Sequence, residues 1–510
     1  MQQALHDYTK LHQLSRHART LTGIAHLLEW DQETYMPAGA AESRGEQLKT
    51  LAGLIHTEKT GKKFANLLSK LIDIPSGTIK AKNLSHPQTA AVREWRREYI
   101  KSKALPKRFV EEFAKHSSNS ILAWREAKSK NAFKDFAPFL KKTVDMLRKK
   151  AEYVGYEAHP YDALLDDYEP GVTTQEISKI FTPLRQSIVD LLKKISAAKQ
   201  VDDRFIHGKF PHDKQLAFSK RLLHDMGYDM HFGRLDLSTH PFSLAPHPTD
   251  SRITTRFHPT SLMSCISVVL HEAGHALYEM GLPKEQYGSP LGDYVSLGIH
   301  ESQSRWWETR IGQSKPFWKH YLPLLKEQFK GNLDKVSLDD FYRALNKVEP
   351  TLIRVEADEV TYSLHVILRF ELERALIEGS LAVKEVPEVW NAKMKELLDI
   401  TPPTNAEGCL QDIHWSMGAF GYFPTYTLGN LYAAHLFEAF AKKHSDWEKQ
   451  VAAGNLVFIK DWLKESVHQH GRRYSSHELL TNITGKKFNA EAFVNYLNKK
   501  YAEIYDLSHK

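Results

Sequence analysis

The five residues His271-Glu272-Ala273-Gly274-His275 constrain this chain more than any other stretch, because they lie inside an apolar run at 261–280. Apolar side chains recur in that run at helical spacing and predict a largely buried helix. A spacing of four places His271 and His275 one turn apart on the same face, where both imidazoles can reach one metal ion beside Glu272. This pattern is typical of zinc hydrolases, and the alternative is a chance arrangement of these residue types.

A zinc ion on this helix needs a further ligand, because catalytic zinc sites usually combine three protein groups with an open position for water. We expect Glu301, which lies on a second predicted helix (296–311) after a connection rich in Gly and Pro. Glu279, one turn beyond His275, and Glu308, two turns beyond Glu301, are the alternatives. The choice of Glu301 rests partly on the family resemblance described below.

The bound ion of such a site lowers the pKa of a water molecule to about 7 and polarises the carbonyl of the scissile bond. Glu272 is then expected to be the general base, taking a proton from the attacking water and passing it to the leaving amine. Its alternative role is that of an acidic group that only orients a metal ligand.

Composition excludes several other classes of protein. Hydrophobic residues make up 42% and charged residues 26% of the 510 residues, as in an ordinary globular protein. A net charge of +7 without a basic tract argues against nucleic-acid binding. The two cysteines, Cys265 and Cys409, exclude a disulfide-rich scaffold. Because we find neither a signal-peptide core nor an apolar run of about 18 residues, we expect a cytoplasmic protein without a membrane partner.

Helical periodicity extends over most of the chain. It predicts helices at about 3–29, 43–56, 87–104, 107–129, 133–153, 174–198, 296–311, 316–330, 338–347, 353–378, 386–399, 427–444, 446–469 and 488–505. Residues 161–172 are expected to form an acidic loop near a cleft. Without internal repeats or a long linker, residues 1–510 are predicted to form a single domain with helical lobes on either side of a groove.

Residues 230–257 depart from this pattern. Alternating and β-branched residues with Pro and Gly between them predict short strands and turns. We expect a small antiparallel sheet directly before the metal-binding helix, where an edge strand can hold an extended peptide.

Six motifs follow one another in a recognisable order: HPF at 240–242, DSRIT at 250–254, HEAGH at 271–275, HESQ at 300–303, IRVEAD at 353–358 and GCLQDIHW at 408–415. In these motifs the chain resembles the Taq-type metallocarboxypeptidases, the thermostable carboxypeptidase 1 family (peptidase family M32). WDQETYMPAGA at 30–40 and FGYFPTYTLGN at 420–430 extend the resemblance over nearly the whole length, whereas 60–105 contains no recognisable motif.

The resemblance implies a mainly α-helical, bilobed fold with a deep groove, similar to neurolysin and angiotensin-converting enzyme. It implies one Zn²⁺ per chain, for which Co²⁺ can substitute, held by His271, His275 and Glu301 with Glu272 as the base. It also implies a homodimer that releases C-terminal amino acids one at a time, with broad specificity, from peptides with a free C-terminus.

An enzyme of this kind must recognise a free α-carboxylate, so arginines are the first candidates for substrate binding. By itself, Arg354 with its neighbouring acidic residues suggests a salt bridge on a helix surface, whereas the match to IRVEAD favours carboxylate binding. Arg252 of DSRIT is the second candidate, and its alternative is a structural pair with Asp250. His240 of HPF is expected in a subsite or in a buried turn.

The aromatic stretch at 414–426 contains candidate hydrogen-bond donors. His414 and either Tyr422 or Tyr426 are expected to donate to the oxyanion of the tetrahedral intermediate, and core packing is the alternative for each tyrosine. Gln411 and Asp412 are expected to orient His414 or to shape the groove.

Three other functions remain as alternatives to a carboxypeptidase. The first is an endopeptidase or peptidyl-dipeptidase on the same fold, which would also cleave peptides whose C-terminus is amidated. The second is a non-catalytic scaffold stabilised by a metal, which conflicts with Glu272 because structural zinc sites are normally closed by four protein ligands. The weakest is a basic nucleic-acid binder.

Overall fold

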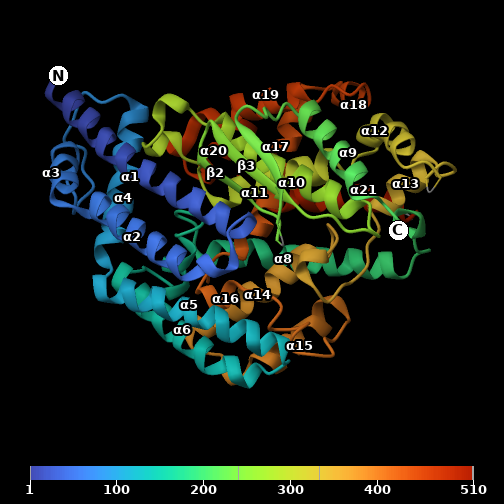
Figure 1. Ribbon diagram of the computed structural model, residues 1–510, viewed down its shortest axis with the longest axis horizontal. Coiled ribbons are helices and arrows are strands. Elements are labelled where there is room, and N and C mark those ends of the chain that lie inside the picture. The colour runs from blue at the N-terminus through green and yellow to red at the C-terminus, as the bar shows by residue number, and fades with distance from the viewer. Residues whose placement is uncertain (1, 239, 332, 508–510) are drawn as a thin grey trace.

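The computed structural model describes residues 2–238, 240–331 and 333–507, and most of these residues are helical (Figure 1). The first part of the chain forms α1 (Gln2–Thr34), α2 (Ala41–Thr60), α3 (Lys62–Leu71), α4 (His86–Ala104), α5 (Lys107–Ser129), α6 (Phe133–Val154), α7 (Pro160–Leu165), α8 (Thr174–Ser196) and α9 (His212–Asp225). The expectation of a mainly α-helical protein is therefore confirmed.

Two helices that follow a small sheet lie at the centre of the molecule with a third helix from near the C-terminus (Figure 1). They are α10 (Met263–Gly281), α11 (Leu297–Arg305) and α17 (Pro424–Lys443). The remaining helices are α12 (Lys315–Gln328), α13 (Leu338–Leu345), α14 (Tyr362–Glu378), α15 (Val386–Leu398), α16 (His414–Met417), α18 (Trp447–Ala452), α19 (Val457–Ser466), α20 (Ser476–Thr484) and α21 (Glu491–Ile504).

Capping residues explain where several helices begin. The Thr173 side chain accepts a hydrogen bond from the backbone N–H of Glu176, whose carboxylate accepts from the backbone of Thr173. Ser85 and Gln88 form the same reciprocal pair at the start of α4. These pairs satisfy N–H groups that have no partner within the helix. The predicted start of a helix at 174 is thus confirmed.

The predicted helix at 353–378 is wrong in its first part. Arg354–Glu356 form a single 3₁₀ turn (η6), and α14 begins only at Tyr362. The carboxylate of Asp358 accepts hydrogen bonds from the N–H groups of Val360 and Thr361 and so holds the connecting segment as a turn. Arg354 consequently lies in a turn, in which it is the one buried residue, with 5% of its surface exposed.

Two other boundaries differ from the prediction. The first helix continues through the predicted break and ends at Thr34. The predicted helix at 446–469 is divided into α18 and α19, because Gly454 adopts a positive φ of 84° between them. A backbone conformation of this kind ends a helix and favours glycine.

The sheet is mixed rather than antiparallel. It consists of β1 (Gly233–Leu237), β2 (Ser243–His247) and β3 (Asp250–Thr255) in the order β1-β3-β2. β2 and β3 form an antiparallel hairpin, whereas β1 pairs in parallel with β3, Gly233 facing Ser251 and Leu237 facing Thr255. The chain reverses direction twice between β1 and β3, so these two strands run in the same direction. β3 lies between β1 and β2 in the sheet. The sheet packs on α10, as expected.

Two hydrophobic cores hold the helices together. The larger unites buried side chains from Trp124 to Tyr505 and includes the apolar face of α10. The smaller joins α1, α3 and α4 through residues such as Leu11, Leu68 and Trp95, with Leu291 from the middle of the chain. Long-range packing therefore connects the N-terminal helices to the region between α10 and α11.

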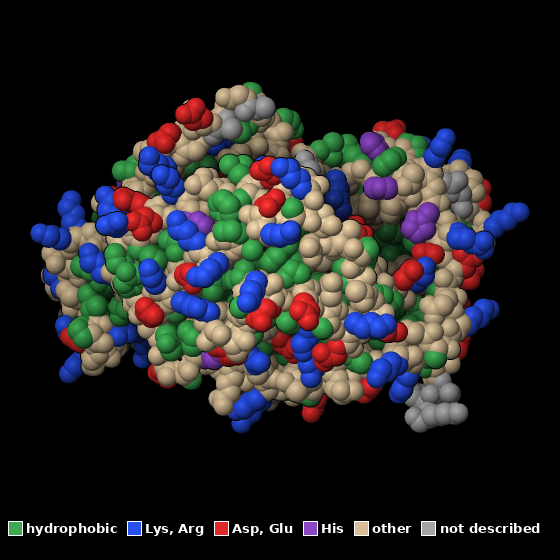
Figure 2. Space-filling view, turned by 90° about the horizontal axis from the view of Figure 1, so that it is seen from below, with side chains coloured by type: hydrophobic (Ala, Val, Ile, Leu, Met, Phe, Trp, Pro, Cys, Tyr) green, Lys and Arg blue, Asp and Glu red, His purple; other side chains and the backbone are tan. Residues whose placement is uncertain are grey.

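The surface carries charges of both signs. Figure 2 shows basic and acidic side chains interspersed over the face seen from below. None of the helices within the described ranges is long and apolar enough to cross a membrane.

Candidate metal centre

A glycine determines how closely α10 approaches α11. A Cβ atom added at Gly274 would lie 2.5 Å from the carbonyl oxygen of Gln303 and 2.6 Å from Cα of Ser304, closer than real Cβ contacts. On the other side of α11, a Cβ at Gly429 of α17 would lie 2.5 Å from Cγ of Glu301. Two glycines thus allow the helices to pack closely enough for Glu301 to reach the histidines of α10.

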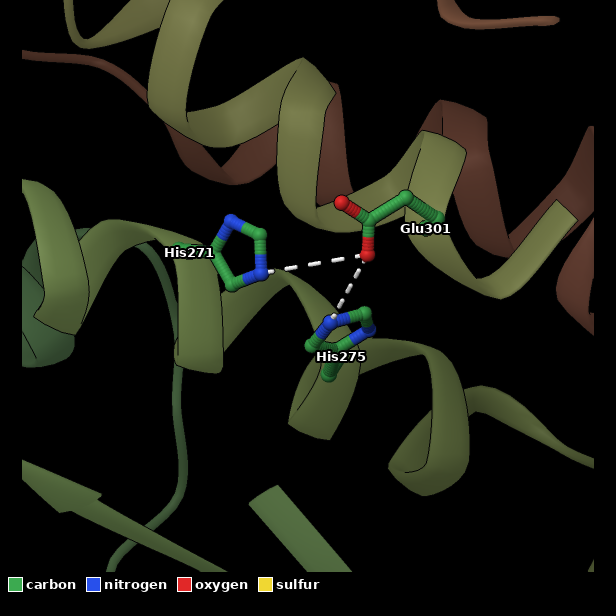
Figure 3. A group of neighbouring side chains, drawn as sticks. All are labelled: His271, His275 and Glu301. Atoms are coloured by element: carbon green, nitrogen blue, oxygen red, sulfur yellow. Dashed lines mark ion pairs between the residues drawn. The ribbon is translucent and has the colours of Figure 1, made fainter. Parts of the chain in front are cut away.

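His271, His275 and Glu301 point toward a common centre (Figure 3). Oε2 of Glu301 lies 3.9 Å from Nε2 of His271 and 3.5 Å from Nε2 of His275. All three ligand atoms lie within 4.8 Å of one another, and among the described residues this is the one group of at least three His, Cys, Asp or Glu side chains that can hold a metal ion.

The geometry fits a transition-metal ion. Ligand atoms bound at about 2.0–2.1 Å in a tetrahedral arrangement are roughly 3.3–3.4 Å apart. The Glu301–His275 distance of 3.5 Å is close to this value, and the Glu301–His271 distance of 3.9 Å requires only a small inward movement. Two imidazole nitrogens and one carboxylate oxygen are also donors that suit zinc.

Glu308 lies behind His271 rather than beside Glu301. Its Oε2 is 2.8 Å from Nδ1 of His271, on the opposite side of the ring from the shared centre, and it accepts a 2.7 Å hydrogen bond from Nη1 of Arg305. Burial alone would lower the pKa of His271, but the carboxylates of Glu301 and Glu308 raise it to about 9. The site therefore stabilises positive charge.

Glu279 also lies behind a histidine of the central group, but a second histidine lies between them. It contacts His300 of the HESQ motif, and His300 contacts Nδ1 of His275. Burial lowers the pKa of His275 to about 4, so its imidazole is neutral and can offer a lone pair. Glu308 thus contacts the far side of the His271 ring directly, and Glu279 reaches that of His275 through His300. Of the three candidate carboxylates, only Glu301 reaches the shared centre.

Glu272 is buried next to His271, with 8% of its surface exposed. Burial, followed by the negative charges of Glu301 and Glu308, raises its pKa to about 7 despite the opposing effect of His271. Among the described residues, no hydrogen bond or ion pair occupies its carboxylate. A carboxylate in this state can accept a proton readily.

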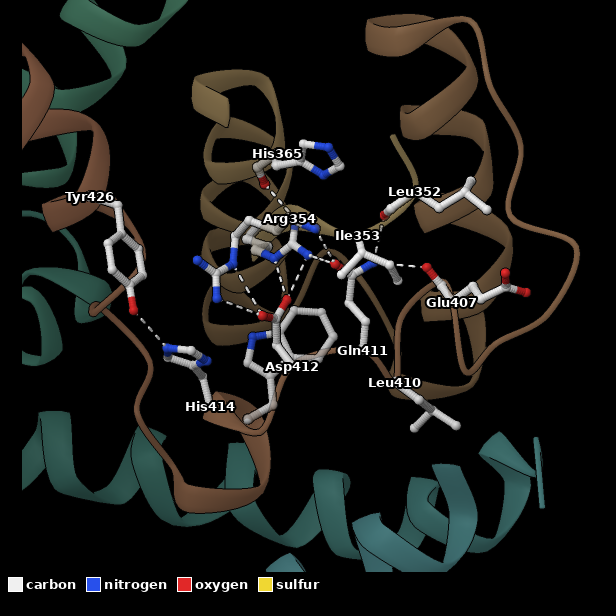
Figure 4. A network of polar contacts seen from close by, with 12 residues as sticks. Leu352, Ile353, Arg354, His365, Glu407, Leu410, Gln411, Asp412, His414 and Tyr426 are labelled. Carbon is white, nitrogen blue, oxygen red and sulfur yellow. Dashed lines mark hydrogen bonds and ion pairs between the residues drawn. The ribbon is translucent and has the colours of Figure 1, made fainter. Parts of the chain in front are cut away.

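Arg354 belongs to a buried network with residues of GCLQDIHW (Figure 4). Its Nε and Nη2 donate to Oδ1 of Asp412 at 3.1 and 2.8 Å, while Nε of Arg369 donates to Oδ2 of the same carboxylate at 2.7 Å. Oε1 of Gln411 accepts from the backbone N–H of Arg354 and from Nη2 of Arg369. We expected Gln411 and Asp412 to orient His414 or to shape the groove. Their hydrogen bonds instead hold Arg354 and Arg369.

The network contains more positive than negative charge. Arg354 is 5% exposed and Arg369 is fully buried, yet Asp412 is the one carboxylate that pairs with them among the described residues. Burial would raise the pKa of Asp412, but the two guanidinium groups outweigh it and hold that pKa well below its usual range. One buried positive charge thus remains without a counterion, a condition that favours binding of an anion.

Several hydroxyl groups lie near Arg354. Nη1 of Arg354 donates to the Tyr362 hydroxyl at 3.0 Å, and its guanidinium lies 4.8 Å from the ring centre of Tyr426. The Tyr426 hydroxyl is 3.3 Å from Nε2 of His414, and the rings of Tyr422 and Tyr426 are 5.3 Å apart. Arg354, His414, Tyr422 and Tyr426, all candidates from the sequence, therefore lie together.

These phenols and His414 are neutral at physiological pH. Burial raises the pKa of Tyr422 and Tyr426, and the charge of Glu301 raises both further. Burial also lowers the pKa of His414 to about 3. Both tyrosines therefore keep a proton with which they can donate a hydrogen bond, and their response to Glu301 places them in its electrostatic field.

Arg252 and His240 have other surroundings. Arg252 forms two hydrogen bonds with Asp250, at 2.7 and 2.9 Å, and its guanidinium lies 4.7 Å from the ring centre of Trp30. His240 is exposed, and its carbonyl accepts a hydrogen bond from Ser238. No hydrogen bond or ion pair of the described residues joins either side chain to the three converging ligands.

Sequence reasoning missed Arg369, Tyr362 and the position of His300. Arg369 left one detectable signal, because it interrupts an otherwise apolar stretch of α14 in which its neighbours are buried. Tyr362 and His300 left no such signal, since their contacts are made with residues on other elements.

Comparison with known proteins agrees with this geometry. Residues 10–501 match the family model described as Carboxypeptidase Taq (M32) metallopeptidase. Thermostable carboxypeptidase 1 of Thermus thermophilus is 40% identical over 509 residues, which cover 98% of this chain and 99% of that protein. Carboxypeptidase 1 of Bacillus subtilis is 38% identical over 480 residues, with 94% and 95% coverage.

Solved structures give the same result. The M32 carboxypeptidase of Deinococcus radiodurans R1 superposes with a TM-score of 0.94 at 38% identity, covering 98% of this chain and 99% of the other. Metallocarboxypeptidase 1 of Trypanosoma cruzi gives a TM-score of 0.91 at 34% identity, with 97% and 99% coverage.

Proposed function

Since the chain belongs to the M32 family of metallocarboxypeptidases, we propose that it is a zinc enzyme that releases C-terminal amino acids one at a time from peptides, with broad specificity. The observation that carries the proposal is the positive charge left over at Arg354 and Arg369. Tyr362 links this charge to the metal-binding group, because its hydroxyl accepts from Arg354 and its pKa responds to the charge of Glu301. A peptide that ends in a free carboxylate supplies the missing anion.

His271, His275 and Glu301 are the proposed metal ligands. One Zn²⁺ per chain suits two imidazoles and a carboxylate, and Co²⁺ prefers similar donors and can replace it. When bound, such an ion supplies Lewis-acid activation of a water molecule and of the peptide carbonyl. Glu308 and His300 hold the two imidazoles in the orientation that leaves their Nε2 atoms for the ion.

Glu272 is the proposed general base. It is adjacent to His271 in sequence, its pKa is raised by burial, and no described partner competes for its carboxylate. Glu272 takes a proton from the attacking water and delivers it to the nitrogen of the leaving amino acid. Two carboxylates with different environments thus serve different purposes, Glu301 as a ligand and Glu272 as a base.

Arg354 is the proposed partner of the substrate's α-carboxylate. Asp412 holds its Nε and Nη2, and Tyr362 accepts from its Nη1, so the guanidinium is kept in place before substrate arrives. Tyr422 or Tyr426, with His414, donates to the oxygen of the scissile carbonyl as negative charge develops there. Arg252 and His240 are proposed, on their motifs, to lie along the groove and contact longer peptides.

The strongest competing function is an endopeptidase or peptidyl-dipeptidase with the same metal site. The deciding experiment compares an amino-blocked peptide with its carboxy-amidated twin, each with and without a chelator and with added Zn²⁺ or Co²⁺. Stepwise shortening of the free-acid peptide alone, abolished by chelation and restored by metal, supports the carboxypeptidase. Equal cleavage of both peptides would exclude it, and full activity after proven metal removal would exclude the mechanism.

We further propose that residues 1–510 act as a single peptidase domain, in the cytoplasm and as a homodimer. The large core that runs from Trp124 to Tyr505 supports one cooperative unit. Cys265 and Cys409 are both free and buried, as suits a reducing compartment. Sedimentation velocity of the purified protein tests the dimer.

A further inference from the structure

A second concentration of positive charge lies away from the metal centre. α12, α13, α18 and α21 gather at one end of the molecule (Figure 1) and surround a cavity of about 940 Å³. Two acidic residues, Glu448 and Glu503, line it. Its basic lining residues are Arg310, Lys315, Lys319, Lys449, Lys499 and Lys500. We call this cavity the Arg310 pocket.

Arg310 is buried without an acceptor for its hydrogen bonds. It is 4% exposed, and its guanidinium lies 3.3 Å from the ring centre of Tyr496 and 5.6 Å from that of Phe493. Among the described residues it makes no hydrogen bond and no ion pair within 4 Å. A guanidinium in this condition is costly, because it has lost water without gaining an acceptor.

The terminal nitrogens of Arg310 are open to the cavity. Nε is fully buried without a partner, whereas Nη1 and Nη2, which also lack partners in the described structure, are not among the fully buried atoms. Stacking on Tyr496 holds the guanidinium on the wall with these donors unused. A guanidinium held in this way can bind an anion through both terminal nitrogens.

A buried carboxylate, Glu359, lies in the electrostatic field of Arg310 but does not pair with it. Glu359 is 3% exposed, and its Oε2 accepts from Nζ of Lys500 at 2.7 Å and from the Tyr496 hydroxyl at 3.1 Å. Burial opposes the charge of Glu359, and the positive charges of Lys500 and Arg310 lower its pKa. Lys500 binds Glu359 directly, whereas Arg310 acts on it only through its charge and forms no ion pair with it within 4 Å.

The rim adds further positive charge. Lys319, Lys449 and Lys499 are exposed and form no ion pair among the described residues, whereas Lys315 pairs with Asp339 at 2.6 Å. The N-terminus of the 14-residue helix α12, capped by Ser314, also lines the pocket. The positive end of its helix dipole favours an anion at the same place.

We propose that the Arg310 pocket binds a small phosphorylated molecule of the nucleotide class, with its phosphate oxygens on Arg310 and the rim lysines. Lys315 and Lys500 are paired with carboxylates, and among the described residues the other four cations of the lining have no ion pair. Four such cations against the carboxylates of Glu448 and Glu503 favour a multiply charged phosphate over a single carboxylate. The volume is far larger than a phosphate ion and lies within the range of small-molecule sites. Phe437, Trp447 and Tyr342 line the remainder and suit a flat ring.

Isothermal titration of the full-length protein at low ionic strength tests this site with three probes: ADP, inorganic phosphate and adenosine. We expect saturable one-to-one binding of ADP, weaker binding of phosphate and none of adenosine. Arg310→Met should lower the ADP affinity at least ten-fold, as loss of a charge-assisted hydrogen bond predicts. The double variant Lys449→Met/Lys499→Met should do the same, and because both lysines are exposed it carries the test if Arg310→Met fails to fold.

Two variants serve as controls. Lys384→Met removes an exposed lysine outside the pocket and should leave the ADP affinity unchanged. Arg354→Met should also retain ADP binding, because its network is separate from the pocket. Absence of ADP binding, or a wild-type ADP affinity in both Arg310→Met and the double lysine variant, would overturn the proposal. Loss of binding in Arg354→Met alone would move the anion to the metal centre, and equal affinity for phosphate and ADP would exclude the nucleotide.

Discussion

Nδ1 of His300 lies 2.6 Å from Nδ1 of His275, and Nε2 of His300 lies 3.0 Å from Oε1 of Glu279. Donation from Nε2 of His300 to Glu279 leaves a lone pair on Nδ1 of His300. That lone pair accepts the Nδ1–H of His275, so Nε2 of His275 carries the lone pair that faces Glu301. A carboxylate one turn beyond His275 therefore selects the tautomer of that histidine through a second imidazole.

Replacement of His300 tests this relay. We expect His300→Ala to weaken zinc binding about 10–100-fold, because a metal-ligating imidazole loses the group that fixes its orientation. Competition with a chromophoric chelator measures the affinity. His224→Ala, at an exposed histidine paired with Asp225, is the matched control. An unchanged zinc affinity in His300→Ala would contradict the relay.

The proposed base can be separated from the proposed ligands. Glu272→Gln should keep zinc at full stoichiometry and lower kcat by about 10²–10⁴-fold or more, because the amide cannot accept the proton of the attacking water. Metal content and turnover of the same preparation measure the two effects. Loss of zinc in this variant would instead give Glu272 a structural role.

Arg354→Lys keeps the positive charge and removes the planar set of donors. For a free-acid peptide we expect kcat/KM to fall about 10–100-fold, as loss of a charge-assisted hydrogen bond predicts, while the slow reaction of the amidated twin changes little. Steady-state rates with both peptides measure the difference. An equal fall of kcat/KM for both peptides would show that Arg354 maintains the structure of the groove and does not bind the α-carboxylate.

Two glycine substitutions separate a packing requirement from a general helix effect. Gly274→Ala should lower the free energy of unfolding by about 1–3 kcal/mol, because its Cβ meets the backbone of α11. Gly53→Ala in α2, with no atom within 4 Å of the added Cβ, should raise it by about 0.5–1 kcal/mol. Urea denaturation measures both. Equal changes in the two variants would show that the approach of α10 to α11 is not limiting.

Glu373 predicts a dependence of stability on pH. Burial raises its pKa from 4.5 to about 7, even though Tyr161, Trp415 and the N–H of Gly421 all donate to it. The folded protein therefore holds a proton that the unfolded chain releases above its own pKa. This contribution to stability is complete below pH 4.5 and disappears as the pH rises through about 7.

The variant Glu373→Gln lacks this proton and isolates the effect. The unfolding free energy of the wild type relative to Glu373→Gln should fall between pH 5 and 7 and be level above about 7.5. Chemical denaturation at four pH values measures it. A difference that rises with pH would contradict the predicted sign.

The relative positions of residues were predicted correctly where the residues are close in sequence. A spacing of four residues on one helix was enough to place His271, His275 and Glu272 together, and the Thr173 cap was enough to locate the start of α8. It failed for the helix around Arg354 and for the parallel pairing of β1 with β3. In both cases contacts outside the local pattern decided the conformation.

The sequence by itself thus determined the helix with two imidazoles and an adjacent carboxylate, the mainly helical class and, through its ordered motifs, the family. Only the tertiary structure decided which carboxylate meets the imidazoles, because Glu279, Glu301 and Glu308 are of similar chemical type and differ in the atoms they reach. It also decided that Asp412 is shared between Arg354 and Arg369. Helical spacing fixes relations within one element, whereas distances between elements depend on how closely helices pack, and at this site Gly274 and Gly429 set that distance.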